Sequence, residues 1–328
     1  MKKILLTGAA GFIGYHLSLF LLKKGLIVYG VDNLNNNYDK RMKEWRVSEL
    51  RKSKNFKFTK IDISSPGTLK KYFSDNFKLN EVHAIINLAA RTGVRKSTID
   101  PYSYYNSNVI GVLNLIQLSK QYKVKKFLHA STSSVYGENK DSSFKVSSDT
   151  NKPLSNYAAS KKSSEILLFA FHKLHRQDIA ILRFFTVYGP AGRPDMSPFI
   201  FIQSSLNSIP IHLLGNGKQK RDVTYIDDVV AGIYKSLKLK GFNTLNIGNN
   251  RPVSINALIE KISKLSKQDI KIIKKPSSPE DVPYTSANLS NTKKLINWHP
   301  KTKIDQGLDK TFNWHVENKE WLKKIKTY

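Results

Sequence analysis

The chain has 328 residues, with 54 Lys and Arg against 25 Asp and Glu and no Cys. This length is sufficient for one large α/β unit, or two domains, with a hydrophobic core. The lack of Cys excludes a disulfide scaffold, a cysteine nucleophile and thiolate-bound zinc or iron. Because no run of about 18 apolar residues occurs, we expect a soluble, cytoplasmic protein with no membrane partner.

The net charge of +29 raises the question of a nucleic-acid partner. The sequence contains 44 Lys but only 10 Arg, spread along the chain, and Arg is the better donor to bases and phosphates. We therefore expect no nucleic-acid partner. The positive field would instead favour polyanionic small molecules, such as a diphosphate-bearing substrate.

The N-terminal segment predicts a strand, a turn, a helix and a second strand. The strand is expected at 3–7 and the turn at 8–14. The helix is expected at 12–24, where Gly25 ends it, and the second strand at 26–31. These elements make one βαβ unit.

The alternation of strands and helices continues along the first half of the chain. Further strands are expected at 56–61, 84–89, 126–131 and 178–184, and helices at 65–76, 106–121 and 157–175. Parallel strands joined by helices predict a doubly wound α/β fold of the Rossmann type. We expect a nucleotide-binding domain at 1–185 and a smaller substrate domain at 186–328, with parts of about 221–249 packing back on the first.

Three glycines predict a dinucleotide site between the first strand and helix. Gly8, Gly11 and Gly14 allow a tight turn and let the backbone approach a pyrophosphate at the helix N-terminus. Asp32 ends the second strand, where a carboxylate binds the ribose hydroxyls and repels a 2′-phosphate. The pattern favours NAD as cofactor.

More cofactor contacts are expected at the carboxyl ends of the next strands, where ligands bind in open α/β sheets. Asp62 is placed to meet the adenine amino group, and small side chains leave room for the cofactor backbone. The candidates here are Asp62, Ile63, Leu88, Ala89 and Ala90.

Tyr157 and Lys161 form the candidate catalytic pair. They lie four residues apart and so share one face of a helix. A neighbouring ammonium and a cationic nicotinamide favour the phenolate, which predicts a lowered pKa and a general base at Tyr157. The hydroxyl cluster at 131–134 ends a strand and can hydrogen-bond the reacting oxygen. The eight His show no metal-binding spacing, and we expect no metal site.

At these motifs the sequence resembles the extended short-chain dehydrogenase/reductases that act on nucleotide sugars. The likeness runs nearly end to end and includes the segments 108–111, 183–190, 221–228 and 279–283. Within that family it is most similar to the UDP-glucuronate 4-epimerases, through the segments 32–35, 38–39, 93–95 and 189–196. The sequence departs from the pattern at 277–281, where a Gly is expected before Asp281.

The resemblance implies roles for individual residues. Tyr157 would be the base, Lys161 its partner and ribose anchor, and Thr132 the hydroxyl that bridges to the sugar oxygen. The implied NAD contacts add Phe12, Ile13, Asn33, Ser107, Tyr157, Lys161 and Phe185 to the glycines and strand ends above. The implied UDP-sugar contacts are Arg95, Thr132, Ser133, Ser134, Tyr157, Thr186, Arg193, Arg221 and Asp281. Arg193 would bind the sugar carboxylate and Arg221 the diphosphate.

The implied reaction is redox-neutral C4 epimerisation through a 4-keto sugar. Sugar 4,6-dehydratases carry Thr-Asp-Glu where this chain has Thr132, Ser133 and Ser134, and decarboxylating relatives carry an acid in place of Ser134, so both are disfavoured. Two alternatives stay open: a 4-epimerase of UDP-glucose or UDP-N-acetylglucosamine, and a non-catalytic NAD-binding regulator. The resemblance also implies a homodimer whose four-helix interface uses 106–121 and 157–175.

Overall fold

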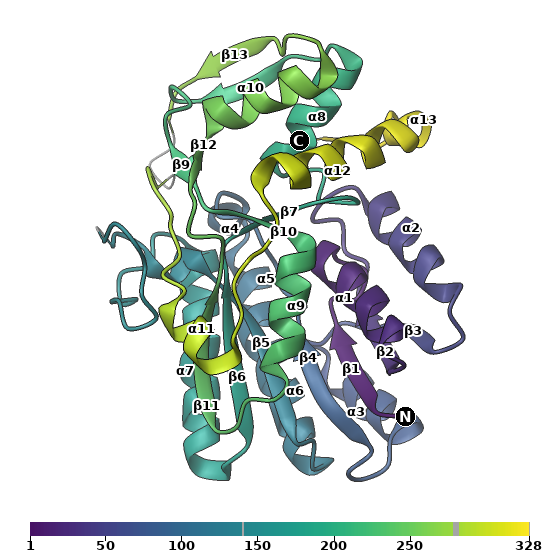
Figure 1. Cartoon of the computed structure of the whole chain (residues 1–328). Coiled ribbons are helices and arrows are strands. Elements are labelled where there is room, and N and C mark those ends of the chain that lie inside the picture. Colours follow the sequence, from purple (N-terminus) through teal and green to yellow (C-terminus); the bar gives the residue numbers. More distant parts are fainter. Residues whose placement is uncertain (140, 278–281, 328) are drawn as a thin grey trace.

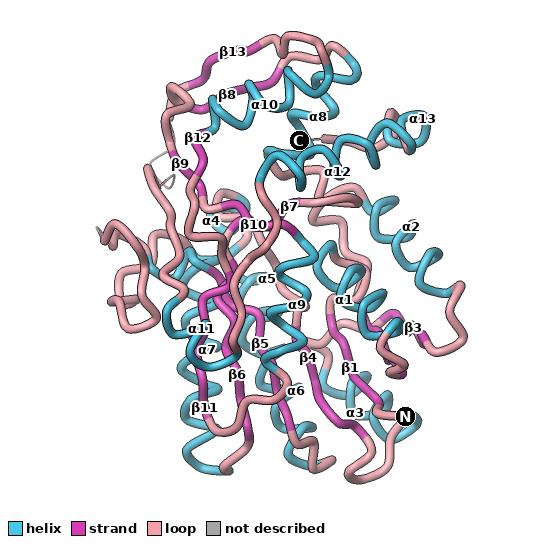
Figure 2. Tube along the Cα trace, in the orientation of Figure 1, coloured by secondary structure: helices cyan, strands magenta, loops and turns pink. Residues whose placement is uncertain are grey.

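The structure is a computed structural model that describes residues 1–139, 141–277 and 282–327. Its centre is a seven-stranded sheet in the order β3-β2-β1-β4-β5-β6-β11, in which all neighbouring strands run parallel (Figures 1 and 2). The strands are β1 Lys3–Thr7, β2 Ile27–Asp32, β3 Phe56–Lys60, β4 Val82–Asn87, β5 Lys126–Thr132, β6 Asp178–Phe184 and β11 Phe242–Ile247. The predicted doubly wound α/β fold is confirmed.

Both faces of the sheet are buried, because side chains that alternate along β1 enter different cores. Ile4 and Leu6 belong to one apolar cluster, together with Leu17 of helix α1 (Phe12–Lys23). Leu5 belongs to the other cluster, together with Phe73 of helix α3 (Pro66–Asn76). All three β1 side chains are fully buried, as expected for a parallel strand covered on both sides.

Helices cover each face. One face carries α1 (Phe12–Lys23), which packs against α9 (Ile226–Ser236). The other face carries α3 (Pro66–Asn76), α6 (Gly111–Gln121) and α7 (Asn156–His175). Because the helices connect parallel strands, the carboxyl ends of those strands all meet at one edge of the sheet, which is the upper edge in Figure 1.

The predicted helix at 106–121 is not a single regular helix. It follows α4 (Lys96–Ile99) and α5 (Pro101–Tyr105), and begins with a π-helical turn at Asn106–Ile110 before α6. The buried Asn108 lies within this turn. Its side chain accepts from the Arg91 backbone N–H at 2.8 Å and donates to the Ser160 hydroxyl at 2.9 Å. The wider turn therefore coincides with a side chain that joins this helix to α7.

A helix that the periodicity did not indicate, α2 (Lys40–Arg51), follows β2. Asp39 caps its N-terminus by accepting from the Arg41 backbone N–H. Its inward face includes the charged Lys43 and Arg46 as well as apolar side chains, and both charged residues are buried. The apolar spacing that reveals an amphipathic helix is therefore broken.

The second half of the chain builds the upper part of Figure 1 and then returns to the sheet. Three two-stranded sheets there pair β10 with β7, β12 with β9, and β13 with β8. Their strands are β7 Thr186–Tyr188, β8 Ile211–Leu214, β9 Lys220–Arg221, β10 Val223–Tyr225, β12 Val253–Ser254 and β13 Ile272–Lys275. The helices are α8 Ser197–Asn207, α10 Ile255–Ser266, α11 Ser290–Ile296, α12 Ile304–Glu317 and α13 Lys319–Leu322.

Residues from both parts of the chain share the central sheet, because β11 pairs with β6 and α9 packs on α1. The assignment of 1–185 to nucleotide binding and 186–328 to substrate binding stays a prediction. None of the helices in the described ranges has the length and apolar character needed to cross a bilayer.

Asp222 joins three segments of the second half. It is fully buried between β9 and β10. Its carboxylate accepts the backbone N–H groups of Asn249, Asn250 and Ala287 at 2.6, 2.9 and 2.8 Å. Such charge-assisted bonds to backbone groups are stronger than neutral ones.

We expect Asp222→Asn to lower the free energy of unfolding by about 2–3 kcal/mol. An Asn side chain has only one accepting oxygen, and its NH₂ group would face backbone N–H groups, which are also donors. Urea unfolding followed by circular dichroism measures the change. Asp269→Asn, at an exposed acid, is the matched control and should stay within about 0.5 kcal/mol of the parent. Equal stability of the two variants would contradict the role given to Asp222.

Candidate active site

A cavity of about 480 Å³ lies at the carboxyl ends of the central strands. Every residue predicted to contact the cofactor lines it. The substrate candidates that line it are Thr132, Ser133, Ser134, Thr186 and Arg193. The cofactor candidates that line it are Gly8, Gly11, Phe12, Ile13, Gly14, Asp32, Asn33, Asp62, Ile63, Leu88, Ala89, Ala90, Ser107, Tyr157, Lys161 and Phe185. The fold therefore brings together residues at or just after the ends of β1 to β6 and residues from both halves of the chain.

The turn between β1 and α1 has no space for a side chain at Gly8 or Gly14. A Cβ at Gly14 would lie 2.1 Å from the Gly8 carbonyl oxygen, and one at Gly8 would lie 2.7 Å from the backbone nitrogen of Ala89. Gly8 also has a φ of +71°, which favours glycine. Gly11 precedes α1 and has no side chain to cap the helix. The first N–H groups of α1 are therefore left for another acceptor at the turn. This is the geometry of a pyrophosphate cradle.

Two carboxylates stand along the predicted adenosine side of the cavity. Asp32 accepts the Leu34 backbone N–H at 2.8 Å and lies 3.5 Å from the Lys43 ammonium. Asp62 accepts from the Asn33 amide at 2.8 Å and the Ser64 hydroxyl at 2.6 Å. Burial raises the pKa of Asp62, but these hydrogen bonds outweigh it, so the net shift is downward. The carboxylate form of Asp62 is thus favoured.

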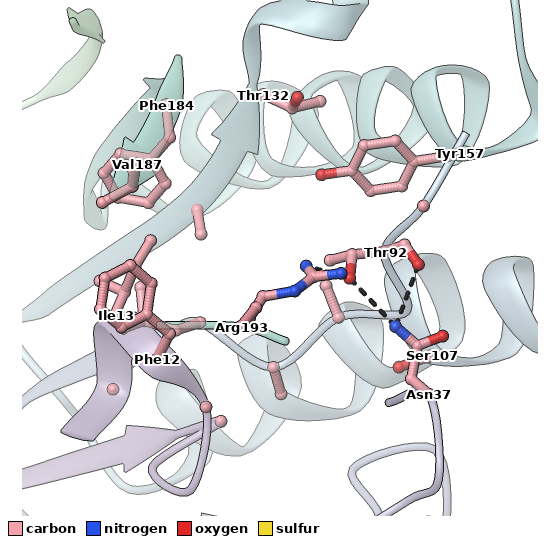
Figure 3. A pocket seen from close by; sticks show the side chains of 18 of the residues that line it. Phe12, Ile13, Asn37, Thr92, Ser107, Thr132, Tyr157, Phe184, Val187 and Arg193 are labelled. Carbon is pink, nitrogen blue, oxygen red and sulfur yellow. Dashed lines mark hydrogen bonds between the residues drawn. The ribbon is translucent and has the colours of Figure 1, made fainter. Parts of the chain in front are cut away.

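Tyr157 and Thr132 point into the cavity from α7 and the end of β5 (Figure 3). Ser155 caps α7 by accepting the Ala158 backbone N–H, which places Tyr157 in the first turn and Lys161 one turn later. The Thr132 hydroxyl accepts the Ser134 backbone N–H at 3.1 Å. The predicted hydroxyl cluster therefore faces the predicted base.

The expected lowering of the Tyr157 pKa includes the charge of a bound nicotinamide; in the chain by itself the shift is in the opposite direction. Burial raises this pKa, and the Thr132 hydroxyl and the Arg193 charge only partly oppose it. Burial also lowers the pKa of Lys161 to about 7, against the raising effect of Glu165. Burial therefore favours the neutral amine of Lys161, which opposes its expected effect on the Tyr157 pKa.

Lys161 belongs to a buried polar chain behind the cavity. Its ammonium lies 3.3 Å from Nε2 of His129. The other ring nitrogen of His129 lies 3.1 Å from the Asn87 amide, and burial keeps the pKa of His129 well below its usual value. The Asn87 amide donates to Nδ1, so the ring proton is on Nε2, which donates to the Ser164 hydroxyl at 2.9 Å.

Arg193 enters the cavity from the loop after β7 (Figure 3). Its guanidinium forms a two-point ion pair with Asp195, at 3.0 and 2.6 Å, and donates to the Thr92 hydroxyl at 2.6 Å. Burial lowers the pKa of Arg193, but Asp195 more than reverses this, and the net shift is upward. Asn37 in turn donates to the Thr92 backbone carbonyl and hydroxyl oxygens.

Some predicted substrate contacts lie elsewhere. Arg95 is exposed at the start of α4, and Arg221 lies on β9; neither lines the cavity. Asp281 lies outside the described residues. In the described ranges no group of three or more His, Asp or Glu side chains is arranged to hold a metal.

The sequence reasoning missed several cavity residues. Asn37, Tyr38, Thr92 and Asp195 lie inside or beside segments that the motifs already marked, so their place in the sequence was a usable signal. Lys43 had no such signal, because it lies on the unpredicted α2. The missed lining residues that carry polar or aromatic groups are Asn35, Asn37, Tyr38, Lys43, Thr92, Phe184 and Asp195.

Comparison with known proteins gives matches over almost the whole chain. The family model described as GDP-mannose 4,6 dehydratase matches residues 5–311. The UDP-glucuronate 4-epimerase of Thermodesulfobacterium geofontis is 46% identical over 327 residues, which is 99% of this chain and 100% of that protein.

Solved structures match equally well. The Bacillus cereus UDP-glucuronic acid 4-epimerase, in complex with UDP-glucuronic acid and NAD, has a TM-score of 0.90 at 34% identity and covers 96% of this chain and 99% of its own. The Thermotoga maritima UDP-glucose 4-epimerase with UDP-glucose has a TM-score of 0.88 at 29% identity, covering 97% and 100%. With its glycine turn, its parallel sheet and these matches, the chain belongs to the extended short-chain dehydrogenase/reductase family of NAD-dependent nucleotide-sugar epimerases and dehydratases.

Proposed function

We propose that the protein is a UDP-glucuronate 4-epimerase, which inverts C4 of UDP-glucuronate to give UDP-galacturonate with NAD as cofactor. The observation that carries this proposal is the presence of a guanidinium, that of Arg193, in the same cavity as Tyr157 and Thr132. A base and a carboxylate-binding group together suit a sugar acid. The names and bound ligands of the relatives support the same substrate.

The residues of the cavity fit NAD. The cradle at Gly8–Gly14, which a single Cβ would fill, suits the pyrophosphate. Asp32 suits the ribose hydroxyls and Asp62 the adenine amino group, while Lys161 suits the second ribose. The chemistry supplied by bound NAD⁺ is reversible hydride exchange at C4 of the sugar, which makes the reaction redox-neutral.

Residues of the chain itself transfer the proton of the C4 hydroxyl and bind the C6 carboxylate of the sugar. Tyr157 takes the proton of the C4 hydroxyl and later returns it to the same oxygen, and Thr132 orients that oxygen by a hydrogen bond. Buried Lys161 lies one helical turn after Tyr157 on α7. Arg193 binds the C6 carboxylate. This matters because a 4-keto sugar acid is a β-keto acid, which loses carbon dioxide when its C5–C6 bond aligns with the carbonyl π system.

The dehydratase named by the family model is disfavoured for this chain. A 4,6-dehydratase expels water from C6 and requires a carboxyl acid beside Thr132. Ser133 and Ser134 occupy those positions and line the cavity, and neither can supply that acid.

One observation favours a neutral UDP-hexose as the second candidate. Asp195 already neutralises Arg193 through two hydrogen bonds. A neutral sugar such as that of UDP-glucose would therefore leave no buried charge unpaired. Arg193 still has N–H groups beyond its three observed bonds, so a carboxylate can bind beside Asp195.

We also propose a homodimer. The α5–α6 region and α7 pack against one another and expose large apolar side chains. These residues are Tyr102, Ile110, Leu113, Ile166 and Phe169. Two copies that meet on this surface would form a four-helix interface and bury it.

The purified protein is expected to convert UDP-glucuronate into UDP-galacturonate without a UDP-linked pentose and without net NADH, as followed by proton NMR of the H4 and anomeric signals. Tyr157→Phe should reduce turnover by about 10²–10⁴-fold while NAD binding is kept, because only the proton acceptor is lost. Turnover of neutral UDP-hexoses alone would support the second candidate. Turnover of none would favour a non-catalytic NAD-binding protein.

The stability of the protein should depend on pH through Lys161. Below about pH 7 this lysine is charged in the folded and unfolded states, and the cost of burying the charge is fully present. Between there and the unfolded pKa of about 10.4 the unfolded state binds more protons, so stability rises with pH. The free energy of unfolding of Lys161→Met, measured with urea, should therefore exceed that of the parent by an amount that decreases from pH 7 to pH 10. A difference between the two proteins that stays constant with pH would contradict this prediction.

The dimer is tested by Ile110→Lys combined with Ile166→Lys, which should give a monomer in size-exclusion chromatography with light scattering. A charge at the centre of an apolar interface cannot be solvated. Ile209→Lys is the control, since Ile209 is 55% exposed but follows α8, away from this surface. A dimer that survives the double substitution would place the interface elsewhere.

A further inference from the structure

The loop before Arg193 is held by two helices of the nucleotide-binding half. The ring Nε2 of His16, on α1, donates to the Pro190 carbonyl at 2.8 Å. Arg46, on α2, donates to the carbonyls of Ala191 and Gly192, both at 2.8 Å. Three consecutive carbonyls that lead directly to Arg193 are therefore fixed by side chains more than 140 residues away.

Arg46 is a buried arginine whose hydrogen bonds are complete. Its side chain is 0% exposed. A guanidinium has five N–H donors, and Arg46 makes five hydrogen bonds: two to the Ala191 carbonyl, and one each to the Gly192 carbonyl, the Ala10 carbonyl and the Tyr38 hydroxyl. The bond to Ala10 is important, because Ala10 lies in the glycine turn of the cofactor site. One side chain thus joins the turn that cradles the dinucleotide to the loop that carries Arg193.

A second route also leads from Arg46 to Arg193. The Tyr38 hydroxyl accepts from Arg46 at 2.7 Å, and the Arg193 guanidinium lies 5.5 Å from the centre of the Tyr38 ring. Arg46 therefore fixes both the backbone before Arg193 and an aromatic ring against which Arg193 rests.

The loop needs this support. Ala191 has a φ of +51°, in the left-handed region that costs a residue with a side chain about 1 kcal/mol or more. The surrounding bonds must supply the energy that keeps the loop in this shape. Without Arg46, the Ala191 and Gly192 carbonyls would lose their partners within a buried site.

We infer that Arg46 is a positioning residue for carboxylate recognition: it fixes Arg193 relative to the dinucleotide turn, and so sets both the selectivity for a sugar acid and the retention of its carboxyl group. This inference rests on the proposed function. Arg46 does not line the cavity itself and acts by controlling the position of Arg193, which does.

The chemical consequence is specific. If Arg193 holds the carboxylate loosely, the C5–C6 bond of the 4-keto sugar can align with the carbonyl. Carbon dioxide then leaves, the electron pair of the bond passes to the C4 carbonyl as an enolate, and C5 takes a proton from water. Loss of Arg46 should therefore produce a UDP-linked 4-keto pentose, and a UDP-linked pentose once the hydride removed from C4 is returned, neither of which the parent protein makes.

The test compares Arg46→Lys and Arg46→Met with Arg51→Met, an exposed position on the same helix. Calorimetry on the NAD-loaded protein measures Kd for UDP-glucuronate and UDP-glucose, and NMR measures the pentose fraction. We expect the Kd for UDP-glucuronate to rise about tenfold or more in the Arg46 variants, as for a lost charged hydrogen bond. The Kd for UDP-glucose should change by less than about twofold, and Arg51→Met should match the parent.

His16→Phe keeps the inference testable if the Arg46 variants do not fold, which thermal unfolding decides. It removes only the bond to Pro190 and should shift the same Kd ratio in the same direction by a smaller factor. In an Arg193→Met background, Arg46→Lys should cause no further loss of selectivity, because Arg46 acts through Arg193.

Two results would overturn the inference: an equal loss of affinity for both ligands, which indicates a merely structural role, or additive effects of Arg46→Lys and Arg193→Met. Failure of the proposed function is seen separately, in the parent protein, as turnover of neutral UDP-hexoses only. The inference fails if the parent prefers UDP-glucuronate and Arg46→Lys has the same ratio of Kd values for the two ligands as the parent.

Discussion

The structure depends on the parallel arrangement of its central sheet. Because each strand is joined to the next by a helix across a face, all carboxyl ends must come to one edge. The glycine turn after β1, the carboxylates after β2 and β3, and the hydroxyls at the end of β5 are far apart in sequence, yet they line one cavity. The tight contact of Gly8 and Gly14 backbones then decides how closely a pyrophosphate can approach.

Around this cavity, charged side chains are buried in matched sets. Arg193 pairs with Asp195, Lys43 with Asp32, and Arg183 makes a two-point pair with Glu165 behind the hydroxyl cluster. Arg46 differs from these pairs, since carbonyl and hydroxyl oxygens take all its donors. A buried charge that loses a partner is costly, so each pair holds its segments in one arrangement. The site is therefore rigid where it recognises charge.

The catalytic pair shows what burial does to reactivity. Burial raises the pKa of the Tyr157 phenol and lowers that of the Lys161 ammonium. The protein alone therefore shifts both groups toward their neutral forms. A positive charge in the cavity would shift the phenol toward phenolate, which explains why this chemistry is coupled to a cationic cofactor.

The sequence by itself determined the alternating elements, the glycine turn, Asp32 and the Tyr157–Lys161 pair, because these depend on spacing within one strand, turn or helix. Only the tertiary structure decided which residues reach the cavity from elsewhere. Helix α2 was not predicted because the charged Lys43 and Arg46 lie on its buried face. Their partners, Asp32 and the carbonyls of residues 191–192, lie outside the helix in the sequence. The direction of the Tyr157 pKa likewise follows from burial, which is a property of the folded chain and not of local spacing.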